Sequence, residues 1–191
     1  MSSENGSDPE WAAWLEVQRA ATLFWMQGEA SAAVAAIDHY LEEKPRVDLS
    51  RQAIGFRGSI HEDQGDLEAA KNDFVAANGL SENDDFERYT LLVSLGEIAE
   101  RRGVPAEADS WYVAALRTAA SDPKTSGASA LLRLVRLRGR EGLTDQERFI
   151  AEKVMRQGWS LLRVAGEPDM GDLVATATRL LEAQKRPLSA S

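Results

Sequence analysis

Apolar residues recur at three- and four-residue steps along most of the chain, which is the period of an amphipathic helix. Valine, isoleucine and threonine do not form the alternating apolar and polar runs that are typical of strands. The pattern therefore predicts an all-helical chain with short turns. Taken from one start signal to the next, it predicts nine helices, at residues 9–27, 29–43, 50–64, 66–79, 85–102, 105–120, 127–141, 144–165 and 169–185.

Start signals place the beginnings of several of these helices. Pro9 and Pro105 suit the first turn of a helix, where the missing amide hydrogen is not needed. Asp66, directly after a glycine, is a residue type that caps helix N-termini. Thr144 and Glu147 have the three-residue spacing of a capping box, in which each side chain binds the other residue's backbone amide.

Glycines separate the predicted helices at nearly constant spacing. Gly28, Gly65, Gly103 and Gly142 each end one helix just before another begins, and successive members of this set are 37, 38 and 39 residues apart. A helix–glycine–helix unit that recurs at a fixed period is typical of solenoid proteins, in which hairpins stack because none buries its apolar face alone. The spacing therefore predicts a series of stacked helical hairpins.

The residues around these glycines repeat as well. Where two helices cross closely, only a small side chain fits on one of them, and a large side chain on the other fills the remaining space. The sequence shows this combination in two consecutive units: Gly58, Ala70, Phe74 and Ala77 in one, and Gly96, Ala108, Tyr112 and Ala115 in the next.

This pattern resembles the tetratricopeptide repeat, whose fingerprint has a Leu-Gly pair and later an alanine, an aromatic residue and another alanine. The resemblance covers residues 11 to 120, and it weakens at Val135 and Glu147 of the fourth unit. It implies a short right-handed α-solenoid with repeats near 11–45, 50–82 and 86–120, a degenerate repeat at 127–165 and a C-terminal helix at 169–185. We expect one domain over residues 9–186, between disordered ends at 1–8 and 187–191.

The charge and composition exclude some kinds of partner. A formal net charge of −9 and a pI near 4.8 disfavour nucleic acid and favour a basic or neutral protein or peptide. The chain has no cysteine, which rules out disulfides and thiolate chemistry. The N-terminus does not resemble a signal peptide, and no apolar run reaches the ~18 residues that span a bilayer. We expect a cytoplasmic protein that does not enter membranes.

His61, Glu62 and Asp63 stand side by side and could form an acid–base or metal site. A metal site needs several convergent ligands, and the other histidine, His39, lies on the second helix of a different predicted unit. We therefore expect His61 to be half-buried with a local hydrogen bond. The sequence also contains no phosphate-binding loop and no complete hydrolase motif. We expect no enzymatic activity, no metal and no cofactor.

In tetratricopeptide proteins, one stripe of the first helix of each repeat lines a concave groove that binds peptides. The resemblance implies a groove here with an aromatic end, an acidic middle and a basic end. Two simpler interpretations remain open: the acidic positions belong to a solvated helix face, and the arginines pair with neighbouring carboxylates. The candidate partner-binding residues are Gln18, Thr22, Trp25, Ser59, Glu62, Asp63, Glu97, Glu100, Arg136 and Arg140.

The leading hypothesis is a non-catalytic interaction module that holds a peptide or helix of a partner protein in this groove. One alternative is a dedicated chaperone or immunity-type regulator of a single client. Another is a homodimer or larger scaffold that assembles through the N-terminal helix, which carries Trp11, Trp14 and Trp25. We interpret these tryptophans as a hydrophobic end cap.

Overall fold

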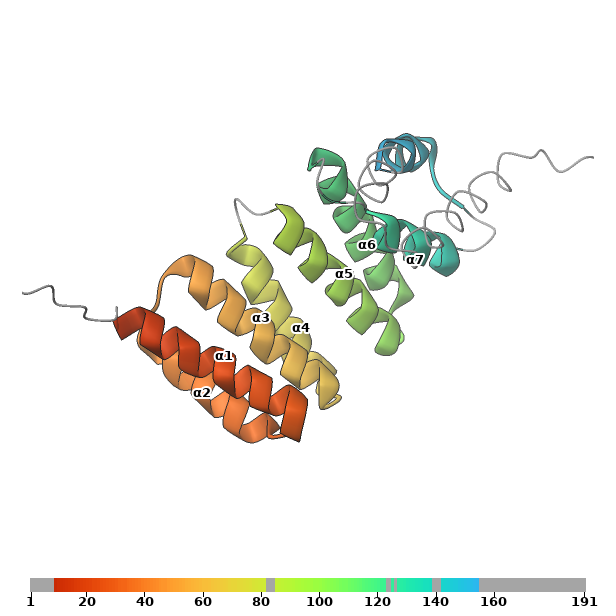
Figure 1. Ribbon diagram of the computed structural model, residues 1–191. Coiled ribbons are helices and arrows are strands. Elements are labelled where there is room, and N and C mark those ends of the chain that lie inside the picture. The colour runs from red at the N-terminus through yellow and green to blue at the C-terminus, as the bar shows by residue number, and fades with distance from the viewer. Residues whose placement is uncertain (1–8, 82–84, 123–124, 126, 139–141, 155–191) are drawn as a thin grey trace, which may run out of the picture. The chain divides into compact units, whose positions relative to one another are not determined.

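The computed structural model describes residues 9–81, 85–122, 125, 127–138 and 142–154. Over these residues every regular element is a helix, which confirms the predicted all-α class (Figure 1). The chain divides into two compact units, an N-terminal unit at Met1–Glu82 and a C-terminal unit at Asn83–Ser191. None of the helices in the described ranges is both long and apolar enough to cross a membrane.

Each unit is built from helices that pack against their neighbours in the chain. In the N-terminal unit, α1 packs on α2, α3 on α4, and α1 and α2 also contact α3; in the C-terminal unit α6 packs on both α5 and α7. A further helical segment covers residues 145–154, while the rest of the predicted helix 144–165 and the whole of 169–185 lie outside the described residues. The bounds are α1 Pro9–Gln27, α2 Ala30–Glu42, α3 Val47–Asp63, α4 Leu67–Gly79, α5 Asp85–Arg101, α6 Pro105–Ser121 and α7 Ala128–Arg138.

The glycine turns form as predicted, and the turn between α3 and α4 shows why. Gly65 has a φ of +80°, a left-handed conformation in which a side chain is strained. This conformation lets the amide groups of Gly65 and Asp66 bind the carbonyls of Glu62 and His61, at 3.0 and 2.9 Å, which ends α3. Asp66 then accepts a hydrogen bond from the Ala69 amide at 3.1 Å and starts α4. Gly28, Gly103 and Gly142 also have positive φ.

The start of α3 differs from the predicted one by three residues. The helix begins at Val47 rather than at residue 50. The backbone amide of Arg46 donates to the Glu10 carboxylate at 2.7 Å, so a side chain from α1 fixes the entry to α3. Asp48 adds a negative charge to the first turn, where it is favourable. A start that depends on a contact 36 residues away cannot be recognised from local sequence signals.

The close helix crossings predicted at the paired glycines are confirmed. A Cβ atom added at Gly58 would lie 2.8 Å from the ring of Phe74, and one added at Gly96 would lie closer still to the ring of Tyr112. Real Cβ atoms do not approach other heavy atoms this closely. In these two hairpins the first helix therefore needs glycine at this position, because an aromatic ring of the second helix rests on its backbone.

Each unit has an apolar core of its own. In the N-terminal unit, residues of α1, α2 and α3 form one cluster, with Val17, Ile37 and Ile60 almost completely buried. In the C-terminal unit, Leu116 and Leu134 lie in a second cluster that joins α5, α6 and α7 with the 145–154 helix. Both cores leave parts of the helix surfaces uncovered, and these parts are the candidate binding surfaces.

Candidate protein-binding surface

One side of α1 carries large apolar side chains that the N-terminal unit does not cover. Trp11 and Trp25 are each 57% exposed, Leu15 is 63% exposed and Met26 is 76% exposed. Steps of three and four residues lead from Trp11 and Leu15 through positions 18 and 22 to Trp25 and Met26, so these side chains share one helix face. We call this surface the α1 face and define it by Trp11, Leu15, Gln18, Thr22, Trp25 and Met26.

The α1 face carries no charge along its length. Thr22 is exposed and Gln18 is half-buried. The Thr22 hydroxyl donates to the backbone carbonyl of Gln18 at 2.8 Å, so its proton is already used within the helix. The structure therefore brings three of the predicted binding residues, Gln18, Thr22 and Trp25, onto one largely apolar surface.

Helix α3 carries the next set of predicted binding residues, and no other described residue packs on the helix at Gly55, near the centre of this set. Ser59 and Glu62 are half-buried, while Asp63 is exposed at the last residue of the helix. The Ser59 hydroxyl donates to the carbonyl of Gly55 at 3.2 Å. A Cβ atom added at Gly55 would meet no neighbour within 4 Å, in contrast to Gly58 on the same helix. Packing within the unit therefore does not require a glycine at position 55.

This contrast predicts opposite effects for the same substitution at two positions of α3. Gly55→Ala is expected to raise the free energy of unfolding by about 1 kcal/mol, because alanine is the better helix former and has room. Gly58→Ala is expected to lower it by about 1 kcal/mol, because overpacking against Phe74 outweighs the same gain. Urea unfolding followed by circular dichroism measures both. If Gly55→Ala lowered the free energy of unfolding, the space that the structure shows beside Gly55 would be wrong.

Under the α1 face, Trp14 belongs to the core rather than to the surface. Its ring stacks on Phe56 of α3, with centroids 6.0 Å apart and planes 13° apart, and lies 5.8 Å from the ring of Tyr40 in α2. Trp14 is buried, whereas Trp11 and Trp25 are exposed. The three tryptophans therefore do not form one end cap, because the middle one joins three helices and the outer two face away from them.

The predicted half-burial of His61 and its hydrogen bond are confirmed. It is half-buried, and its Nδ1 atom lies 3.0 Å from a carboxylate oxygen of Asp73 in α4. Arg57 binds the same carboxylate with two hydrogen bonds, at 3.0 and 2.6 Å, and also pairs with Asp38 of α2. The hydrogen bond to Asp73 raises the pKa of Arg57. Arg57 thereby links the first hairpin of the unit to the second.

Within the residues that the structure describes, no three His, Cys, Asp or Glu side chains are arranged to hold a metal ion.

In the C-terminal unit, predicted acidic and basic residues lie in contact. Arg136 of α7 donates to Glu100 of α5 at 2.8 Å. Arg133, the next arginine on the same side of α7, pairs with Glu97 and lies 3.9 Å from Glu100. The expected acidic and basic stretches are therefore not separate here, because their charges neutralise each other within the unit. Arg140 lies outside the described residues.

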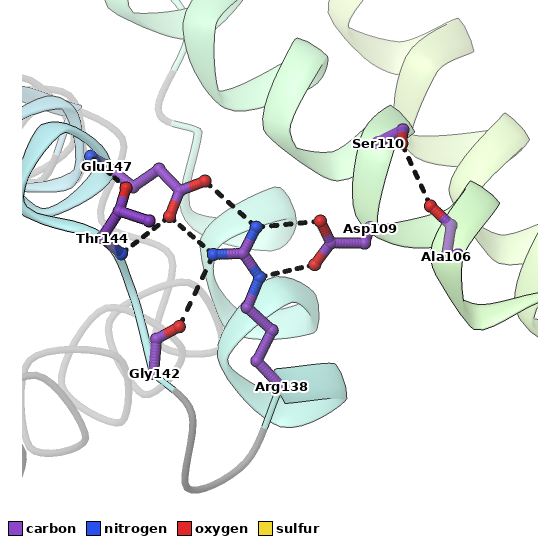
Figure 2. Close-up of polar contacts among 7 residues, drawn as sticks. All are labelled: Ala106, Asp109, Ser110, Arg138, Gly142, Thr144 and Glu147. Atoms are coloured by element: carbon purple, nitrogen blue, oxygen red, sulfur yellow. Dashed lines mark hydrogen bonds and ion pairs between the residues drawn. The ribbon is translucent and has the colours of Figure 1, made fainter.

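Arg138 of the C-terminal unit also links two hairpins, and it is not among the predicted partner-binding residues (Figure 2). Arg138 of α7 lies between Asp109 of α6 and Glu147 of the 145–154 helix. It donates to Asp109 at 2.5 and 2.8 Å and to Glu147 at 2.5 and 3.0 Å. Arg57 makes the same kind of link, because it binds Asp73 of its own hairpin and Asp38 of the preceding hairpin.

The capping box predicted at the start of the 145–154 helix is present. The Thr144 amide donates to the Glu147 carboxylate at 2.8 Å, and the Glu147 amide donates to the Thr144 hydroxyl at 3.3 Å. Burial alone raises the pKa of Glu147, but hydrogen bonds from Arg138 and Thr144 outweigh it and lower the pKa to about 2. Glu147 is therefore both a helix cap and a member of the Arg138 link.

Comparison with known proteins identifies the fold but no family. No protein-family model matches the chain, and no curated protein is similar in sequence. The crystal structure of BtubC (BKLC) from P. vanneervenii is similar in structure, with a TM-score of 0.56 and 16% sequence identity over 95% of each chain. At this level of identity the likeness shows a shared arrangement of helices and nothing about activity or partners.

Proposed function

We propose that this chain is a non-catalytic protein-interaction module that binds a helix or an extended peptide of a partner protein on α1 and α3 of its N-terminal unit. Its hairpins act as tetratricopeptide-like repeats of a short right-handed solenoid, and the first helices of the repeats provide the binding surface. The observation that carries this proposal is the α1 face, with four large apolar side chains that are more than half exposed.

Isolated exposed apolar residues are ordinary on protein surfaces, but contiguous ones mark interaction sites. The α1 face is continuous along the helix: Trp11 and Leu15 lie at one end, Trp25 and Met26 lie at the other, and the uncharged Gln18 and Thr22 connect them. Tryptophan is enriched at the energetic centres of protein interfaces, because one side chain buries a large area with little loss of conformational freedom. Trp11 and Trp25 are suited to that role.

The open position at Gly55 supports the same surface. A glycine in a helix interior costs about 1 kcal/mol relative to alanine. At Gly58 close packing against Phe74 explains the glycine, but no contact within the unit explains it at Gly55. A partner that approaches the backbone of α3 would explain it, because only glycine leaves the helix surface free at that point.

The acidic residues of the C-terminal unit are less suitable for testing this proposal. Glu97 and Glu100 pair with arginines of α7, so a charge reversal would disturb the packing of α5 on α7 as well as any partner. The side chains of the α1 face are uncharged, so they take part in no ion pair. Substitutions there change the surface, and the Trp25 ring also packs edge-on against Phe24 of the core cluster, with ring centroids 4.9 Å apart.

The experiment is affinity capture from native lysate with the wild-type chain and Trp25→Glu, read by mass spectrometry. We expect Trp25→Glu to lose the captured proteins, because burying a charge in an apolar interface costs several kcal/mol. Phe149→Glu is the matched control, since Phe149 is 72% exposed on the C-terminal unit. Equal capture by all three chains would contradict the proposal.

A further inference from the structure

We draw no further inference here: the strongest candidate, the exposed apolar α1 face of the N-terminal unit, is already the surface of the proposed function, and nothing in the residues that the structure describes shows what covers it.

Discussion

Gly96→Leu is expected to lower the free energy of unfolding by about 3 kcal/mol, which is at the upper end of typical overpacking costs. The backbone at Gly96 lies against the ring of Tyr112, which is completely buried. The ring cannot move aside without disturbing Ala108 and Leu116 of the same core, both of which are also buried. The better helix propensity of leucine recovers less than 1 kcal/mol of this loss.

The matched control for this prediction is Gly55→Leu, which inserts the same side chain into the interior of a helix where a Cβ has no neighbour within 4 Å. We expect its free energy of unfolding to equal or exceed that of the wild type. Urea unfolding of the three chains, compared at equal m-value, gives both differences. If Gly96→Leu unfolded at the same urea concentration as Gly55→Leu, the close crossing of α5 and α6 would be wrong.

These glycines show which parts of the fold the sequence predicts well. The positive φ values at Gly28, Gly65 and Gly103 and the crossings at Gly58 and Gly96 follow from residue type and spacing alone. Few residue types fit such positions, so a glycine at the right spacing indicates a turn or a close helix crossing. Six of the seven helices α1 to α7 begin within one residue of the predicted position for the same reason, since local turn and cap signals set them.

Contacts between distant side chains are harder to predict. Arg57 binds Asp38 and Asp73, which are 19 and 16 residues away, and Arg138 binds Asp109, which is 29 residues away. Any of the many acidic residues of this chain could have been the partner. One signal was present: Asp73 stands beside Phe74 in the buried stripe of α4 and is itself buried. A charged residue in such a stripe needs an opposite charge nearby.

The sequence predicts where the candidate residues lie on their helices, but not which side chains around them are exposed. Stripe positions on α1 and α3 follow from helix geometry, and the structure places Gln18, Thr22, Trp25 and Ser59 as that geometry requires. Helix geometry could not show which apolar residues the core would leave uncovered. Trp14 and Trp11 are only three residues apart, but the first joins three helices and the second is exposed. That difference depends on where α2 and α3 pack.

The link between hairpins in the C-terminal unit predicts a specific loss of stability in acid. The pKa of Glu147 is about 2 in the folded chain and has an ordinary value of 4.5. Because the folded value is the lower one, the contribution of Glu147 is complete above pH ~5 and is lost as the pH falls toward 2. At about 1.4 kcal/mol for each pKa unit, this loss amounts to about 3 kcal/mol.

The measurement is the difference in unfolding free energy between the wild type and Glu147→Gln as a function of pH. We expect the wild type to be more stable by about 3 kcal/mol near neutral pH and the difference to vanish near pH 2, because protonation removes the same charge that the substitution removes. Asp145→Asn is the matched control: Asp145 is fully exposed in the same turn and lies 3.8 Å from Arg148. Its curve is expected to follow the wild type throughout, since a solvated pair contributes little. A difference between the wild type and Glu147→Gln that stayed constant from neutral pH to pH 2 would mean that Glu147 stabilises the unit through packing and not through its charge on Arg138.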